Sequence, residues 1–599
     1  MADFKYIKKL YDELKAEREK YRSRWEKLSK YVGIKSPVQN GATADKQPTE
    51  DKDLDKYTYD PTAALSVQQS SDYLKGIMWG NGENIFTLEP SDEVLDMADI
   101  DEVKDWYAYA TEKTLYHMNH PESGLDGALA EYFYDQKWVG TSGLGCFQNA
   151  EFKNGTAENA LLFRAYGVDT MCIDEGKNGL VEVVFNTYNW RVNRIVQEFC
   201  SKKEGFDMAQ FNKLPERIRN DYKAGNMNNT HTIVNAVLPS DMYDPTGAGR
   251  KKAKYIGYWF SADATEKDDV FFTEYFNEKP ICVGREEKVR GEIYGRSSGS
   301  MLISTIECVN EGVAGIMETL DKMNKPPIGI YGDSLFGDSV VDTSANALTI
   351  FNANALNGLD PIVKMQDIGD PSGLINFLLP YLNEKISTAF KIDILLDFSA
   401  KSNMTATESM QRYAIRGRSL SGLIVRHKTE VIDPIINRSL SILWDLETLG
   451  YKSTDTKAVE DMKKAGKVER IIPDAVVKAK NEGKRWYKIR YNNDIEKLTR
   501  VEVFEDLTKE INIITALMSV YPDIAEAVNW HKLLADASDA MGFKDLIISE
   551  KNFKDAIKQK AEAMAQMQQA QVANMQSQTN KNNAGAINEF GKSEQTGQQ

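Results

Sequence analysis

A long amphipathic helix that runs into two consecutive prolines is the feature that most constrains how this chain can fold. Apolar residues recur at steps of three and four between Met301 and Asn324, the spacing of a helix with one buried face. At ~1.5 Å per residue, such a helix is roughly 35 Å long. Pro326 and Pro327 end it, because proline has no backbone N–H and clashes with the preceding turn. The apolar stripe consists of Leu302, Ile306, Val309, Val313, Ile316, Leu320 and Met323.

The segment after the prolines predicts a small β-containing insertion and then a second helix. Residues 328–370 are rich in Gly, Asn and Asp and contain short β-type runs such as "GIYGD" and "LTIFN". The second helix is expected from about Pro371. A loop containing "LLDFSAKSNM" then precedes a long helix, at whose start Thr405 and Glu408 have the spacing of a capping box. Pro434 is expected to kink this helix.

The remaining segments combine helices with one stretch of strands. The first 35 residues show helical spacing of apolar residues, and Asp60 before Pro61 marks another helix start. Alternation of apolar and polar residues from Leu161 to Phe199 predicts a β-meander, which continues through "AKYIGYWFSADATEKDDVFFTEYF". After Arg500 the chain is expected to be helical, and its Gln/Asn-rich end disordered.

The composition indicates a packed, acidic protein. With 42% hydrophobic and 27% charged residues it is globular, and 599 residues exceed the size of one core. The formal charge of −15 argues against tight retention of nucleic acid on a basic face, although loose passage of a polyanion along an acidic wall is compatible with it. There is no signal-peptide core and no run of ~20 apolar residues. We therefore expect a soluble protein made in the cytoplasm.

Disulfides, metals and cofactors are not predicted. The five cysteines are spread singly without a C-x-x-C pair, and we expect all of them to be buried thiols. His117 and His120 are three residues apart on an expected helix and could present two imidazoles to a metal. A third ligand is missing from the nearby sequence and Pro121 ends the helix, so a capping or surface role is expected instead.

Gly295, Ser297 and Gly299 spell G-x-S-x-G, the motif in which hydrolases present a nucleophilic serine. A triad needs a histidine downstream, and only His427 and His531 follow, both in helical sequence. The phosphate-loop pattern G-x-x-x-x-G-K-[ST] is absent, and "VGTSGLG", from Val139 to Gly145, is expected to end a helix at a closely packed turn. A helix start without chemistry is the favoured interpretation.

The order of several segments resembles the portal proteins, or head-to-tail connectors, of short-tailed bacteriophages. The resemblance runs from about Tyr11 to about Gly542. It is carried by "LYDELKAEREKYRSRWEKLSKY", "AALSVQQSSDYLKGIMW" before "FTLEP", "WVGTSGLGCFQ", "YGRSSGSMLISTIECVNEGVAGIMETLDKMNKPPIGI" and "MTATESMQRYAIRGRSLSGLIVRHKTEVIDPIIN". The family commonly has "YGRGPG" before its helix, whereas Ser297 and Ser298 stand at the fourth and fifth positions here.

The resemblance implies a mainly helical α+β portal fold with wing, stem, clip and crown regions, assembled as a ring around a central channel. Within the stem, it places Ser300 to Asn324 and Pro371 to Ile392 in the channel wall. The implied divisions are 1–35 an N-terminal amphipathic helix, 36–58 a polar linker, 59–290 the wing, 291–325 the first stem helix, 326–370 the clip, 371–392 the second stem helix, 393–404 the tunnel loop, 405–510 the long wing helix with a following β and helical segment, 511–575 a helical wing or crown region and 576–599 a disordered tail.

The resemblance also implies particular contact residues. The candidates for touching DNA in the channel are Lys391, Lys401, Ser402 and Asn403. Lysines on such a loop would contact the phosphate backbone without reading bases. The candidates for docking the terminase and the tail adaptor on the clip are Ile328, Tyr331, Phe336 and Phe351.

The implied function is a structural one, without enzymatic activity. The chain would form a ring, of twelve subunits in this family, at one capsid vertex. Double-stranded DNA would be packaged through it by the large terminase and later ejected. Its partners would be the terminase, a tail adaptor, and the major capsid and scaffolding proteins, with no membrane, and its location the virion. Two alternatives stay open: a serine esterase using Ser297, and a capsid-associated adaptor or scaffold without DNA passage.

Overall fold

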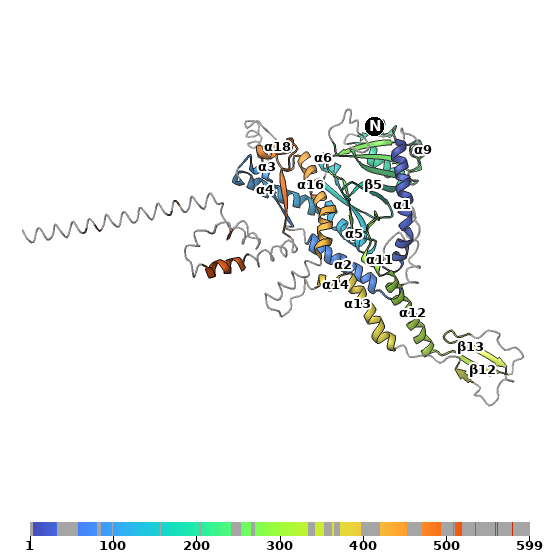
Figure 1. Cartoon of the computed structure of the whole chain (residues 1–599). Helices are drawn as coiled ribbons and strands as arrows, with labels where there is room; N and C mark the ends of the chain where they lie inside the picture. Colours follow the sequence, from blue (N-terminus) through green and yellow to red (C-terminus); the bar gives the residue numbers. More distant parts are fainter. Residues whose placement is uncertain are drawn as a thin grey trace, which may run out of the picture. The chain divides into compact units, whose positions relative to one another are not determined.

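The computed structural model describes most of the chain up to residue 492. The described ranges are 4–32, 58–80, 85–98, 100–155, 157–202, 205–240, 253–264, 270–332, 342–352, 362–364, 372–396, 420–451 and 470–492, with short pieces after residue 500. The chain divides into two units, Met1–Ile495 and Glu496–Gln599. In the second unit, residues 509–517 are helical, as the sequence predicts. All elements named below belong to the first unit (Figure 1).

A five-stranded antiparallel sheet carries the N-terminal helix on one face. Its order is β10 (Val270–Phe276), β9 (Tyr255–Ser261), β8 (Thr230–Pro239), β5 (Val181–Arg191) and β4 (Met171–Glu175). The predicted N-terminal helix is confirmed as α1 (Phe4–Tyr31). Phe4 and Tyr11 of α1 pack on Phe260 and Phe185, with ring centroids 5.3 and 5.5 Å apart. Alternate residues of each strand therefore meet α1.

Short helices cover the other face of this sheet, where the sequence interpretation was partly wrong. The predicted β-meander extends to Phe199, but β5 ends at Arg191 and helix α7 (Val192–Cys200) follows. The buried residues Val192, Ile195, Val196 and Cys200 have helical spacing, so they face the sheet only from a helix. The pair β6 (Ser201–Lys202) and β7 (Gly205–Phe206), α8 (Met208–Phe211) and α9 (Glu216–Lys223) complete this layer.

The largest hydrophobic core surrounds a second sheet with the order β11 (Ile281–Arg285), β2 (Thr141–Gln148) and β3 (Leu161–Tyr166). The first strand of the predicted meander, β3, thus belongs to a different sheet from β4. Helices α2 (Thr62–Met78), α4 (Ile100–Asn119), α5 (Leu125–Trp138), α16 (Asp433–Asp445) and α18 (Asp474–Asn481) and the two-stranded sheet of β1 (Phe86–Pro90) and β15 (Tyr487–Tyr491) contribute to this core. The short elements are α3 (Asp92–Leu95), a 3-10 turn Pro121–Ser123 and α6 (Ala150–Asn154).

The predicted helix–insertion–helix arrangement is confirmed, and we call it the stem hairpin. The first helix is α11 (Ser298–Met301) continued by α12 (Ile303–Asn324), with a break at Leu302. The insertion is a sheet with the order β13 (Leu348–Asn352), β12 (Ile328–Gly332) and β14 (Ile362–Lys364). The returning helix contains the turn Leu374–Leu378 and α13 (Leu379–Ala389), and α14 (Ile392–Leu396) follows. Helices α12 and α13 lie against each other (Figure 1).

Two helices of this unit accommodate an internal proline in the same way. A π-helical turn, Leu374–Leu378, directly precedes α13, whose second residue is Pro380. A second π-helical turn, Lys428–Ile432, directly precedes α16, whose second residue is Pro434. Proline cannot donate the regular helical hydrogen bond, and the wider turn before it reduces the clash of its ring. The structure thus places an irregularity at Pro434, where a kink was expected.

Candidate functional site

Ser297 caps a helix and does not occupy the position of a nucleophile. Its hydroxyl is buried, donates to the carbonyl of Trp138 at 2.7 Å and accepts from the N–H of Ser300 at 3.0 Å. His427 hydrogen-bonds Tyr132 through Nδ1 at 3.0 Å. Burial lowers the pKa of His427 to about 3, so this imidazole is a poor base. His531 lies outside the described residues. The geometry therefore supports the helix start that the sequence favoured and does not favour the esterase alternative.

The two glycine-containing motifs singled out in the sequence pack directly on each other. Gly140, just after α5, has a positive φ of 95°, and a Cβ there would lie 2.5 Å from the backbone of Arg296. A Cβ on Gly295 would overlap the carbonyl oxygen of Gly140. The N–H of Gly295 also donates to Thr141 Oγ1 at 2.8 Å. The expected close-packed turn at "VGTSGLG" is confirmed, and both glycines are explained by backbone contact.

A buried ion pair fixes the start of the first stem helix. Lys137, at the end of α5, donates to Glu286 at 2.9 Å, and both side chains are almost completely buried. The same carboxylate accepts from the N–H and from the hydroxyl of Ser298, each at 3.1 Å. A carboxylate at a helix N-terminus satisfies donors that have no partner within the helix and is favoured by the helix dipole.

A second buried cation, Arg285, connects the start of the first stem helix to the π-helical turn Lys428–Ile432. Arg285 donates to Glu430 at 2.7 Å and also pairs with Glu175. The other oxygen of Glu430 accepts from the backbone N–H of Arg285 at 2.8 Å. Glu430 lies in the π-helical turn, and Arg426, one turn earlier, donates to the carbonyl of Glu286 at 2.6 Å. We call Lys137, Arg285, Glu286, Ser297, Ser298 and Glu430 the junction.

The sequence analysis did not single out the charged residues of the junction. Arg285 and Glu286 stand in "ICVGREEKV", directly after a buried strand, where charges usually mark the return to solvent. Nothing in that run shows which of its charges are buried. The nearest signal for this burial is the pair of glycine motifs. Glycines allow two backbone segments to lie in close contact, and such a contact leaves little room for water around nearby charges.

The histidine pair has structural roles. His117 is buried and shares a 3.1 Å hydrogen bond with Asn159, and burial lowers its pKa. His120 accepts from the N–H of Glu122 at 3.3 Å and so caps the turn that begins at Pro121. The expected capping role is confirmed for His120. Within the described residues, no cluster of three or more histidine, cysteine or carboxylate side chains could hold a metal ion.

The cysteines correct one expectation. All five are free thiols, and four are buried, but Cys308 on α12 is exposed. Burial raises the pKa of Cys146 to about 11 and of Cys282 to about 12, which makes these thiols unreactive. Cys308 therefore is the one thiol of the chain that a reagent can reach.

The predicted channel residues are only partly described. Lys391 lies in the turn between α13 and α14 with a positive φ of 59°, and its N–H donates to the carbonyl of Thr388 at 2.9 Å. Lys401, Ser402 and Asn403 lie outside the described residues. The start of the expected loop, from Asp393, is instead helical and belongs to α14, whose first residue, Ile392, is buried in a hydrophobic core.

Three of the four predicted clip residues lie in one small sheet. Ile328 begins β12 and is 36% exposed. Tyr331 and Phe351 are paired in the parallel ladder of β12 and β13. Phe336 lies outside the described residues. The structure therefore brings Ile328, Tyr331 and Phe351 together, in the insertion where the sequence predicts them.

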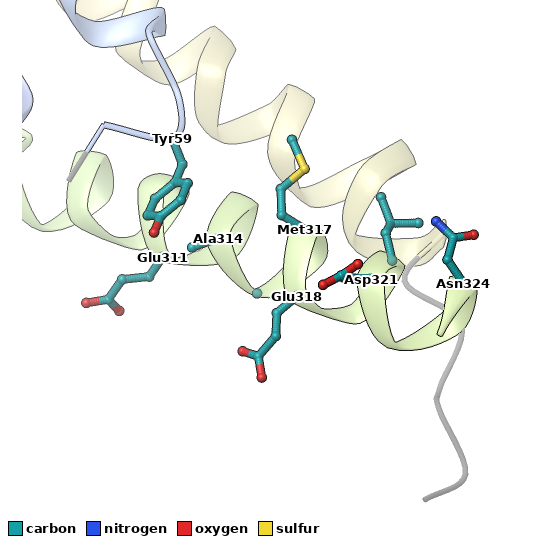
Figure 2. A pocket seen from close by; sticks show the side chains of 9 residues that line it. Tyr59, Glu311, Ala314, Met317, Glu318, Asp321 and Asn324 are labelled. Atoms are coloured by element: carbon teal, nitrogen blue, oxygen red, sulfur yellow. The ribbon is translucent and has the colours of Figure 1, made fainter. Parts of the chain in front are cut away.

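A shallow groove of about 860 Å³ follows the outer face of α12. Its floor is made by the small residues Ala314 and Gly315. Figure 2 shows Glu311 and Glu318 on one side of the helix and Met317 on the other. The remaining lining residues are Tyr59, Leu320, Asp321 and Asn324. Among the described helices, none combines the length and apolar character that crossing a membrane requires.

Comparison with known proteins identifies the family. The family described as "Bacteriophage head to tail connecting protein" matches residues 5–450, well over half of the 599 residues. A curated protein, the "Probable portal protein" of Bordetella phage BPP-1, is 22% identical over 269 residues. That match covers 43% of this chain and 44% of the relative, so the chain spans less than half the length of this relative.

A solved structure entitled "Virion of native gene transfer agent (GTA) particle" contains a chain that is 13% identical to this one. The match covers 76% of this chain and 89% of that chain, at a TM-score of 0.28, which is too low to support an argument about the fold. The match of the family to residues 5–450 is the finding that decides: the chain belongs to the bacteriophage head-to-tail connecting proteins.

Proposed function

We propose that this chain is a portal subunit that forms a ring around a DNA channel at one capsid vertex. The observation that carries the proposal is the family match over residues 5–450, which includes the whole stem hairpin. DNA would be packaged through the ring by the terminase and later ejected through it. The protein would act as a structural conduit and not as an enzyme, located in the virion.

The stem hairpin supports this proposal physically. It consists of two antiparallel helices, α12 of 22 residues and α13 of 11 residues, joined by a small sheet. Copies arranged around an axis would present a wall of helices to the interior. The chain carries a formal charge of −15, so a wall built from its copies would be acidic. An acidic wall repels phosphates, so DNA could slide along it without sticking.

The clip sheet is the proposed docking place for the terminase and then for a tail adaptor. It lies at the turn of the stem hairpin, between α12 and α13, and exposes apolar residues: Leu348 is 53% exposed and Ile362 is 60% exposed. Exposed apolar side chains on a small sheet are typical of surfaces that bind other proteins. Ile328, Tyr331, Phe336 and Phe351 remain the proposed contact residues. The capsid and scaffolding proteins are the proposed partners of the wing.

The tunnel loop, residues 393–404, is proposed to touch DNA through Lys391, Lys401, Ser402 and Asn403. The test is to replace Lys401, Ser402 and Asn403 with alanine and to measure DNA packaging and retention in assembled particles. We expect rings to form normally while packaging or retention falls. Normal packaging with residues 397–404 deleted would remove the proposed role of the loop.

The ring itself is tested by electron microscopy of the purified full-length chain in negative stain. Rings of about a dozen subunits around an open hole as wide as DNA are expected. Compact single chains or pairs, at concentrations where relatives assemble, would contradict the conduit. Closed discs without a hole would instead favour a capsid-associated adaptor without DNA passage.

A further inference from the structure

The stem hairpin has two outward sides that differ in shape. On α12, Gly312 faces α13, because a Cβ there would lie 3.7 Å from Leu379. Successive helical residues turn by about 100°, so Ala314 and Glu318 lie on the side of α12 opposite Gly312. The groove is therefore on the side of α12 that points away from α13, and the described part of the chain leaves it open.

The other outward side of the hairpin carries large side chains. Tyr381 and Lys385 are spaced four apart, which aligns them along one side of α13, and Phe377 lies in the π-helical turn that directly precedes this helix. Leu379 faces α12, so Tyr381 and Lys385 lie on the far side of α13. Phe377 is 78% exposed and Tyr381 is 54% exposed, and Lys385 lies 5.2 Å from the Tyr381 ring. This side has protruding aromatic residues where the other side has a hollow.

The two sides match in height along the hairpin. Because α12 and α13 are antiparallel and Gly312 is level with Leu379, Phe377 is level with Ala314. By the same register Tyr381 is level with the turn that contains Glu311, and Lys385 with the turn that contains Glu307. A ring operation rotates a copy without shifting it along the axis. A neighbouring copy therefore brings its aromatic side to the height of the groove.

We propose that Phe377 of one copy fills the groove over Ala314 of the next copy, so that the stem is closed by a head-to-tail contact between copies of this chain. The inference rests on the ring proposed above. A ring requires two different complementary surfaces on each subunit, and the hairpin has two. The groove also carries Glu311, which can accept from the Tyr381 hydroxyl, and its acidic rim is complementary to Lys385.

The test is disulfide formation between two differently sized versions of the full-length chain. One version carries Ala314→Cys and the other Phe377→Cys, and both carry Cys308→Ser, which removes the one exposed thiol. Mixed rings, verified by electron microscopy, are oxidised and run on a non-reducing gel. The expected result is a covalent pair of one large and one small chain, which a reductant separates.

Three outcomes would overturn the inference. Rings without the mixed pair would exclude the contact while leaving the portal function intact, whereas a failure to form rings would contradict the portal function as well. Pairing of Ala314→Cys chains with each other would indicate a symmetric contact instead. A control, Tyr116→Cys in place of Phe377→Cys, puts the thiol at another exposed aromatic position, on α4, and should give no pair.

Charge exchange tests the same contact without cysteines. Lys385→Glu should shift chains from rings to single subunits, because it places a like charge beside Glu307 and Glu311. Combining Lys385→Glu with Glu311→Lys should restore the rings. Both side chains are exposed, so each single chain should keep its melting temperature. A failure of the double variant to restore rings that Lys385→Glu had lost would count against the contact.

Discussion

The junction and the stem hairpin are neighbours in the chain but differ in what completes them. At the junction, buried charges meet their partners within one chain: Lys137 with Glu286 and Arg285 with Glu430. Along the stem hairpin, large apolar side chains such as Phe377 and Met317 are left exposed. This difference in where the partners come from indicates that the two regions have different roles. The junction fixes where the stem begins, and the hairpin keeps surface free for contacts beyond the single chain.

The largest effect is expected from removing one charge of the junction. Lys137→Met leaves Glu286 buried without its cation, which should lower the free energy of unfolding by ~3–5 kcal/mol. Urea unfolding of the single chain measures it. The control is Lys484→Met, which breaks a solvent-exposed pair with Glu482 and should cost far less, because water screens exposed charges. Similar losses for both variants would erase the distinction between the junction and ordinary surface pairs.

Two glycine substitutions compare the regions directly. Gly295→Ala forces a Cβ into the carbonyl of Gly140 and should destabilise the chain by ~2–4 kcal/mol. Gly315→Ala places a Cβ where nothing lies within 4 Å, so it should stabilise α12 by up to ~1 kcal/mol. Thermal unfolding should show a lower melting temperature for Gly295→Ala and a higher one for Gly315→Ala. A tolerated Gly295→Ala would mean that the two glycine motifs can move apart.

Two buried groups near the junction are expected to respond to pH in opposite directions: His427 should destabilise the chain as the pH falls, and Asp135 of α5, whose pKa burial raises to about 7, should oppose it. Burial lowers the pKa of the His427 imidazole to about 3 in the folded chain, from 6.5 when exposed. Below pH 6.5 the unfolded chain binds a proton that the folded chain does not, so stability present above pH 6.5 is lost as the pH falls. The contribution of His427 to this loss from pH 7 to pH 5 is about 2 kcal/mol. His427→Gln should remove this contribution from the measured pH dependence, and an unchanged slope would exclude it.

The smallest effect concerns Ser297. Ser297→Ala removes the cap on Ser300 and the bond to the Trp138 carbonyl, which should cost ~1–2 kcal/mol of stability. Background hydrolysis of activated esters should be the same for both proteins. Ser300→Ala, whose hydroxyl donates only to the carbonyl of Ser297 at 2.7 Å, serves as the matched control. Ester hydrolysis that disappears only in Ser297→Ala would revive the nucleophile.

The spacing of apolar residues predicted those helices and strands that bury only one face. The apolar stripe between Met301 and Asn324 gave the first stem helix, and short β-type runs gave the clip sheet, because one chemical face is enough to specify each. The prediction failed at α7, where the helical spacing of Val192, Ile195 and Val196 directly follows a long strand and was taken as its continuation. The pattern of apolar residues does not show at which residue the alternation of a strand gives way to the spacing of a helix.

The candidate site was predictable only in outline. The residue segments that resemble portal proteins were sufficient to identify the family, which the match over residues 5–450 confirms. The junction was not predictable, because burial of Arg285 and Glu286 depends on α5 and on the turn containing Glu430, which are distant in sequence. Cys308 was misjudged for the related reason that a stem residue can be apolar in type and still be left exposed.

The π-helical turn at Leu374–Leu378 has a consequence for how one helix can serve two surfaces. Such a turn contains one residue more than an α-helical path needs, so it offsets the phase of everything before it by about 100°. Downstream, Ile386 and Phe390 are committed to the core of their own chain. Within the turn itself, Phe377 is turned outward. Deleting one residue of this turn would restore regular α-helical spacing and point the ring of Phe377 in another direction. The helix would become shorter by only one residue.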